Sequence, residues 1–170
     1  MADLTRGRVI AKVRAGESLE GADLSGLDIT GANLSSGDLK RANLKGANLT
    51  GAYLTGTHLE GASLERADLK SARLRNANLS EANLSGAKLV RTDMSGANLS
   101  GANLSDADLS DANLWKANLS GANLLHANLT RALMAMANLK GANLKKADLT
   151  DTKLIKTELT DTILPEGFEK

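Results

Sequence analysis

Few residues in this chain are of the types that carry out chemistry. The acidic segment 106–108 (Asp-Ala-Asp), followed by Asp111, could suggest a calcium loop, but the spacing of an EF-hand and its distal Glu are missing. His58 and His126 are the two imidazoles, cysteine is absent, and no Ser or Lys has a base fixed beside it. We therefore expect no catalytic residue, no metal site and no cofactor, and we interpret both histidines as solvated or charge-paired.

The dominant feature of the sequence is a period of five residues. Every fifth residue from Leu19 to Leu164 is Leu, Ile or Met, and 27 of these 30 central residues are Leu. Two residues earlier the chain has Ala in 22 of 30 repeats, and one residue earlier it has Asn or Asp in 20 of 30. The second residue after the centre accounts for 12 of the 16 glycines. A fixed short period over most of a chain determines its architecture.

A period of five excludes regular helices and long strands. Five helical residues turn about 500°, which would spread the leucines around a helix, and an odd step would send them to alternate sides of a strand. The chain must therefore turn once per repeat, with the central residue and the small residue two before it pointing inward. Because Arg41 and Lys146 occupy the Gly-rich position, we expect that position to need no positive φ.

These repeats resemble those of the pentapeptide-repeat family. Residues 42–46 (ANLKG) and 97–101 (ANLSG) match the pattern Ala-(Asp/Asn)-Leu-x-x, and the resemblance covers residues 17–166. It implies an all-β fold, the right-handed quadrilateral β-helix (a β-solenoid), in which four pentapeptides form one square coil. About 7.5 coils at ~4.8 Å each would make a rod roughly 36 Å long. Since the repeats contain no insertion, we expect no projecting loop.

The two ends differ from the repeats. Within residues 3–15 the sequence predicts a short amphipathic helix, with Val9, Ile10 and Val13 on one side, which would cap the first coil. A helix on a membrane surface is the alternative. No C-terminal helix is predicted, and Phe168 could fold back over the last leucines. The predicted organisation is a capping helix in residues 1–16, a β-solenoid in residues 17–166 and a C-terminal tail in residues 167–170.

Charge and hydropathy restrict the partners. A net charge of +1 argues against both a polyanion mimic and a strong nucleic-acid binder. No apolar run approaches the length of a membrane span, and the start (MADLTR) lacks the apolar region of a signal peptide. We therefore expect a cytoplasmic protein without membrane association, and the resemblance implies a bacterial one.

With four repeats per coil, residues 20 apart stack directly and the outward residues form four faces. The face centred on Leu34, and on every twentieth residue after it, carries five cationic and one anionic residue. We call it the fourth face. Clustered exposed apolar residues with a charged rim mark contact sites. The alternative is that these residues occur together by chance on a surface that accepts many residue types. The candidate protein-contact patch consists of Trp115, Leu133, Met136, Ile155, Lys116, Lys153, Lys156 and Tyr53.

Most other outer charges have a structural interpretation. Arg91, Asp111, Arg131 and Asp151 stack in one column, where opposite charges on neighbouring strands help to hold the register. Arg73 stacks on Tyr53 and is predicted to make a cation–π contact.

These observations favour a non-catalytic scaffold that binds another protein, of unknown identity, through a flat solenoid face. A homodimer formed through an end or through the Trp115 face is an alternative to a foreign partner. The resemblance also offers a DNA mimic that binds DNA gyrase and protects it from quinolones. This sequence departs from that type in its basic-leaning face and in its lack of a C-terminal helix and of insertions.

Overall fold

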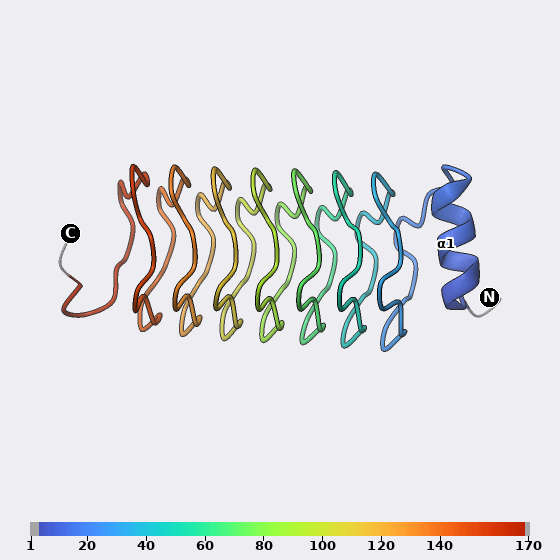
Figure 1. The fold of residues 1–170 in the computed structure, drawn as a ribbon, viewed down its shortest axis with the longest axis horizontal. Coiled ribbons are helices and arrows are strands. Elements are labelled where there is room, and N and C mark those ends of the chain that lie inside the picture. Colours follow the sequence, from blue (N-terminus) through green and yellow to red (C-terminus); the bar gives the residue numbers. More distant parts are fainter. Residues whose placement is uncertain (1–3, 169–170) are drawn as a thin grey trace.

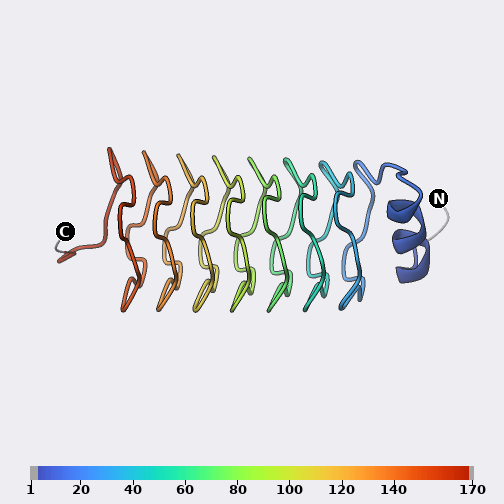
Figure 2. The same cartoon turned by 45° about the horizontal axis from the view of Figure 1, so that its top comes forward.

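The computed structural model describes residues 4–168 and shows a rod of stacked coils. Within these residues there is one helix, α1 (Arg6–Arg14), and the coils follow it along a single axis (Figure 1). Neighbouring coils pair in parallel through single-residue bridges, each joining residues 20 apart, from Asp23 with Asn43 to Asn143 with Ile163. Four pentapeptides therefore form one coil, and the coils keep an even spacing when the rod is turned (Figure 2).

Each repeat is held by the same set of backbone hydrogen bonds. The N–H of Leu34 donates to the carbonyl of Tyr53 at 2.8 Å, and the N–H of Tyr53 donates back to Ala32 at 2.9 Å. Between successive repeats, the N–H of Ala52 donates to the carbonyl of Leu49 at 2.9 Å and closes a turn. The two neighbouring coils thus satisfy the backbone of a very short strand, which explains how a chain that turns every five residues remains regular.

The interior is filled by the central residues and by the small residues two before them. All central residues from Leu19 to Leu144 are at most 3% exposed, which confirms the predicted inside and outside of the repeat. The prediction that every central residue is buried is wrong at the C-terminal end. The central residues of the last repeats are half-buried, because no further coil covers them in this structure: Leu149, Leu154, Leu159 and Leu164.

The turns correct a second prediction. The second residue after the centre has a φ between 53° and 68° in every repeat from Gly21 to Asp161, and 17 of these residues are not glycine. In these turns, which are closed by the bond from the alanine N–H to the leucine carbonyl, the third residue has the positive φ of a type II turn. Arg41 and Lys146 adopt this left-handed conformation despite its strain, because the ladders on both sides fix the backbone.

This strain predicts opposite effects for two Gly→Ala substitutions. Gly141 has a φ of 68° and Gly7 lies in α1, and a Cβ at either position would meet nothing within 4 Å. Gly141→Ala should lower the free energy of unfolding by about 1 kcal/mol through backbone strain. Gly7→Ala should raise it by a similar amount through helix propensity. Urea denaturation measures both, and shifts in the same direction would contradict the assigned turn conformation.

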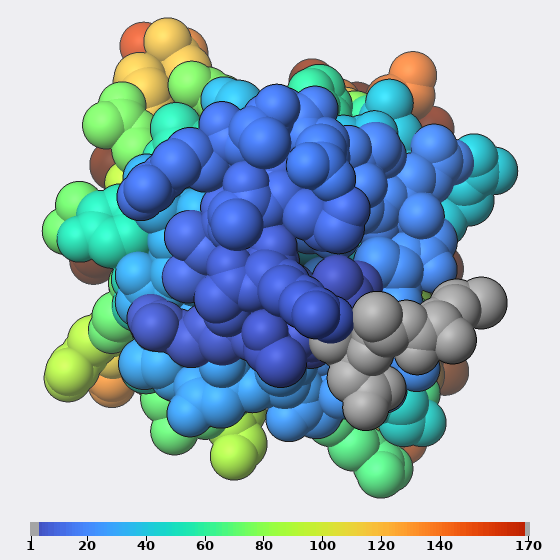
Figure 3. Space-filling model, turned by 90° about the vertical axis from the view of Figure 1, so that its right-hand side faces the viewer, coloured from blue at the N-terminus to red at the C-terminus, as the bar shows by residue number. Residues whose placement is uncertain are grey.

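Helix α1 lies across the N-terminal end of the solenoid (Figure 3). Its N-cap Thr5 accepts a hydrogen bond from the N–H of Arg8, and basic side chains in its last turn suit the negative end of the helix dipole. Val9 is fully buried, while Ile10 and Val13 are half-buried and pack against the core. The Arg6 guanidinium donates to the carbonyl of Thr30 at 2.9 Å. The helix is therefore anchored by both apolar and polar contacts.

Gly37 shows that the first coils are adapted to α1. It occupies an inner position that is usually Ala, and a Cβ there would lie 3.2 Å from Val13 Cγ1 and 2.9 Å from the carbonyl oxygen of Leu34. One coil further on, Thr57 is buried and its hydroxyl donates to the Leu34 carbonyl at 2.9 Å. The departure from Ala at this position therefore leaves space for the helix.

The Asn-rich outer column forms a polar ladder. In each such repeat the Asn Oδ1 accepts the N–H two residues later, as from Ser100 to Asn98 at 3.2 Å. The Asn amide then donates to the residue one coil earlier, from Asn98 to Asn78 at 3.1 Å and from Asn118 to Asn98 at 3.1 Å. This double use of the side chain explains the preference for Asn just before the central residue. Asp fits the same position as an acceptor only, as where Asp93 accepts from the Ser95 N–H and from the Asn113 amide.

Several outer carboxylates are held in their charged form. Hydrogen bonds from Thr30 and Thr150, through the hydroxyl and the backbone N–H, lower the pKa of Asp28 and Asp148. The bond from Arg131, at 2.7 and 2.8 Å, lowers the pKa of Asp111 and confirms that this charge column stacks. The same direction holds for four further carboxylates, Asp23, Asp38, Glu65 and Glu158.

These lowered pKa values predict acid sensitivity. A carboxyl group whose pKa is lower in the folded state stabilises the fold above its unfolded pKa, and this contribution is lost as the pH falls through the folded pKa. The ordinary value for Asp is 3.8, so we expect the urea midpoint to decrease below about pH 5. The double variant Asp28→Asn, Asp148→Asn keeps both side-chain acceptors but removes two titrating carboxyl groups. Its urea midpoint should therefore depend less on pH. A midpoint that rises on acidification would contradict the assignment.

Candidate protein-contact surface

A shallow groove lies on the fourth face towards the C-terminal end of the rod. It has a volume of about 520 Å³, and we call it the Trp115 groove. It follows two adjacent outer columns, one through Asn113, Leu133 and Lys153 and the other through Trp115 and Ile155. The residues that line it are Arg75, Asp93, Ser95, Asn113, Trp115, Leu133, Ala135, Lys153 and Ile155.

The structure brings four of the predicted patch residues together in this groove. Trp115, Leu133 and Ile155 form its apolar part, with 45%, 47% and 65% of their surfaces exposed, and Lys153 lies beside them. Side chains of this size are usually buried. Their exposure on adjacent coils makes a contiguous apolar surface rather than isolated residues.

The other four predicted residues lie outside the groove. Met136, which is 49% exposed, Lys116 and Lys156 occupy the neighbouring turn column. The Lys116 ammonium lies 4.4 Å from the centre of the Trp115 ring, so it covers the indole. Tyr53 is three coils away, and its predicted cation–π contact is confirmed, with the Arg73 guanidinium 4.8 Å from the ring centre.

One end of the groove is polar, and the sequence analysis did not single out its residues. Asp93 accepts hydrogen bonds from the Ser95 hydroxyl at 2.7 Å and from the Asn113 amide at 3.1 Å. Arg75 Nε lies 3.8 Å from the same carboxylate. The 20-residue period could have identified these residues, because Arg75 and Asp93 stand in the same columns as Trp115 and Leu133.

Leu133 is an apolar residue in a column that is otherwise polar around the groove, between Asn113 and Lys153. The corresponding residues on the next face, Asn118 and Asn138, donate to the coil before them at 3.1 and 3.2 Å. Leu133 has no amide to donate. Within residues 4–168, Asn113 Oδ1 therefore accepts one hydrogen bond, from the Trp115 N–H at 3.1 Å. The substitution of an apolar side chain removes a polar contact and adds exposed apolar surface.

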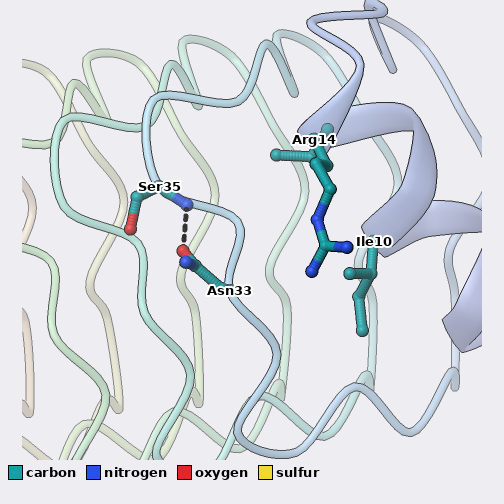
Figure 4. Close-up of a pocket in the computed structure, with 5 residues that line it drawn as sticks. Ile10, Arg14, Asn33 and Ser35 are labelled. Atoms are coloured by element: carbon teal, nitrogen blue, oxygen red, sulfur yellow. Dashed lines mark hydrogen bonds between the residues drawn. The ribbon is translucent and has the colours of Figure 1, made fainter.

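A second cavity lies where α1 meets the first coils (Figure 4). It measures about 280 Å³ and is lined by Ile10, Val13 and Arg14 from α1 and by Asn33 and Ser35 from a coil. Asn33 Oδ1 accepts the N–H of Ser35 at 3.1 Å, which is the turn contact found along the whole rod. We interpret this cavity as the junction between the helix and the solenoid.

Each of the two histidines lies beside a carboxylate on the surface. His58 Nδ1 lies 3.6 Å from Glu60 and His126 Nδ1 lies 3.3 Å from Asp106, both on exposed side chains. Between residues 4 and 168, no three His, Cys, Asp or Glu side chains are grouped so that they could hold a metal ion. Nor is any helix in that range long and apolar enough to cross a membrane.

Comparisons with known proteins agree with this architecture. A family model described as pentapeptide repeats matches in eight copies, over residues 18–46, 47–86, 77–115, 97–134, 107–151 and 127–165. A search of curated proteins gives no match.

Solved structures of pentapeptide repeat proteins are also similar. Rfr23 from the cyanobacterium Cyanothece 51142 is 44% identical over 54% of this chain and 63% of that chain, with a TM-score of 0.53. HetL, which is involved in heterocyst differentiation regulation in the cyanobacterium Nostoc sp. strain PCC 7120, is 28% identical over 99% of this chain and 100% of that chain, with a TM-score of 0.42. QnrB1, a plasmid-mediated fluoroquinolone resistance protein, is 21% identical in a trypsin-treated form, over 84% of this chain and 76% of that chain, with a TM-score of 0.41. The repeats, the 20-residue pairing and the matching family model show that the chain belongs to the pentapeptide-repeat family.

Proposed function

We propose that this protein is a non-catalytic scaffold that binds another protein through the fourth face. The observation that carries the proposal is the Trp115 groove, in which Trp115, Leu133 and Ile155 expose about half or more of their surfaces side by side. A contiguous apolar patch with a charged rim marks a contact site, and Trp is enriched among the residues that dominate binding energy. Members of the family are generally structural or interaction proteins, which supports the same reading.

The gyrase-binding alternative has less support. A DNA mimic needs an uninterrupted run of negative charge along an outer face, comparable to a row of phosphates. The acidic columns here are broken by cations, as where Arg131 stands on Asp111 and pairs with it. The fourth face itself carries an excess of positive charge.

The proposal predicts that Trp115→Ser with Ile155→Ser weakens partner binding without unfolding the rod. Both side chains point outward, so we expect the urea midpoint to change by less than the equivalent of about 0.5 kcal/mol per site. Loss of a central Trp should weaken binding by about 30-fold or more, since hot spots exceed about 2 kcal/mol. The measurement is a quantitative pull-down from the source organism, followed by the affinity of the purified partner.

The matched control is Val90→Ser with Leu125→Ser. These two side chains occupy the same position of the repeat on other faces, where they are half-buried. The control pair should leave partner binding unchanged. Equal binding by wild type and by the Trp115 and Ile155 variant would reject the proposal. Sedimentation of the wild type alone tests the homodimer alternative, which requires an association that the double variant loses.

We also infer that α1 acts as an N-terminal cap on a rod of about 7.5 coils. The bridges from Asp23 to Ile163 continue without a gap, which supports this count. Buried Val9 and the space left at Gly37 support the capping role, because the first coils are shaped to receive the helix. A cap covers a sheet edge that would otherwise pair with other chains.

A further inference from the structure

We propose that the Trp115 groove binds an extended, acidic segment of its partner, which places one apolar side chain over Ala135. This inference rests on the proposed function and adds the chemistry of the partner to it. It depends on three features of the groove: its shape, its charge and the exposed apolar side chain of Leu133.

The shape of the groove suits a single apolar anchor. Trp115, Ala135 and Ile155 stack on successive coils, so a small side chain lies between two large ones. With coils about 4.8 Å apart, the space between the two large side chains is about 10 Å from backbone to backbone. Leu133, 47% exposed, forms one side of this notch. One Leu- or Phe-sized side chain would cover Ala135 and contact all three apolar neighbours.

The length of the groove suits an extended chain. Its lining runs along the rod axis from Arg75 to Ile155, which are four coils apart. Four spacings of about 4.8 Å give about 19 Å, the length of about six residues of extended chain at ~3.3 Å each. Such a segment would lie along the groove and would not need to enter the rod.

The charge of the groove selects an acidic partner. Lys153 and Lys156 make no ion pair within residues 4–168, whereas the single anion, Asp93, already pairs with Arg75. Carboxylates on the Ile155 side of the anchor would therefore meet two unpaired cations, whereas the other end of the groove holds the Arg75–Asp93 pair. A second copy of this face would bring the same excess of cations, five against one anion, and like charges on the two sides of a contact oppose binding. The charge thus favours a foreign, acidic segment over self-association.

The same residues disfavour single-stranded nucleic acid. Such ligands bind through successive aromatic platforms on which bases stack. Trp115 is the one aromatic residue in the lining, and the Lys116 ammonium already lies over its ring, 4.4 Å from the centre. The rest of the floor, Leu133, Ala135 and Ile155, is aliphatic. This surface suits a peptide side chain better than a base.

Leu133 supports a binding role because it gives up a contact that the rod uses elsewhere. An Asn at this position could donate to Asn113 Oδ1, as Asn138 donates to Asn118 at 3.2 Å. We therefore expect Leu133→Asn to raise the urea midpoint slightly while weakening peptide binding.

The test is a random 12-residue peptide library displayed on phage and selected on the intact protein. We expect enriched peptides with net negative charge around one apolar residue, and fluorescence polarisation of a synthetic enriched peptide gives its affinity. Ala135→Trp fills the notch and should reduce peptide binding at least 10-fold. The variant should fold, because the same position of the repeat already holds Trp115 one coil earlier. Lys153→Glu with Lys156→Glu should reduce binding at least 10-fold, whereas Lys40→Glu with Lys140→Glu, both on the face centred on Leu39, should not.

The outcomes separate this inference from the proposed function. Enriched peptides that need Trp115 but are neutral or basic would overturn the inference and leave the proposed function intact. A selection in which no binding depends on Trp115 would overturn both. Binding of fluorescein-labelled oligo(dT) that competes with the peptide and is lost in Trp115→Ser would overturn the inference in favour of nucleic acid.

Discussion

Leu84→Ala is expected to lower the free energy of unfolding by about 2–5 kcal/mol. Leu84 is fully buried at the centre of the rod and is covered by a coil on each side. The substitution removes favourable transfer energy and leaves a cavity that can close only if the coils approach each other. The ladder prevents this, since Leu84 N–H donates to Asn103 at 2.7 Å and Leu64 N–H donates to Asn83 at 2.7 Å. We therefore expect a value in the upper half of the range.

Two controls make this expectation specific, with urea denaturation followed by circular dichroism as the measurement. Ser85→Ala, at the next residue but outside the core, should change stability by no more than about 0.5 kcal/mol. Leu159→Ala, at a central position that is only half-buried, should cost less than Leu84→Ala because less apolar surface is lost. Equal midpoints for the three variants would refute the assignment of inner and outer positions.

The sequence alone was sufficient to predict the architecture because one constraint dominates it. A period of five cannot be accommodated by a helix or a long strand, so the chain has to turn once per repeat. The inward residue is then identified by its apolar type, as at Leu84. That residues 20 apart become neighbours follows from the four repeats per coil that the resemblance to the pentapeptide-repeat family implies. The pairing of Tyr53 with Arg73 follows directly from that rule.

The backbone of the turns could not be predicted from residue types. Arg41 and Lys146 indicated that the Gly-rich position needs no positive φ, yet both adopt one. Local preference was outweighed by the long-range ladder, which fixes the chain on both sides of the turn. The half-burial of Leu149 and Leu164 was missed for a different reason. The period gives every repeat the same environment, whereas a coil at the end of a stack has one neighbour instead of two.

The candidate site was predicted in part. Stacking placed Trp115, Leu133 and Ile155 on one face, and the structure confirms that they are adjacent. The notch at Ala135 was not predicted, because its depth depends on the sizes of side chains one coil above and below. Met136 was predicted to lie beside the column of Trp115, Ala135 and Ile155, and it occupies the neighbouring turn column.

Val9→Asp is expected to release α1 from the end of the rod. Within residues 4–168, Val9 is the one residue of α1 that is fully buried. An ionised carboxylate at this position would cost several kcal/mol without a partner. The protein can avoid this by undocking the helix, so the loss of stability is limited to the docking free energy. Burial of Val9 with partial burial of Ile10 and Val13 puts that limit at about 3–5 kcal/mol.

Two measurements report the release. A helix of nine residues is not stable in isolation, so the circular dichroism signal at 222 nm should lose its helical component. The exposed end of the first coil should then associate with other chains through its open edge, which sedimentation detects. Ala11→Asp is the matched control, because it adds the same charge to an exposed position of the same helix. If both variants keep the helical signal and the wild-type midpoint, α1 does not depend on Val9 for docking, and its role as a cap is wrong.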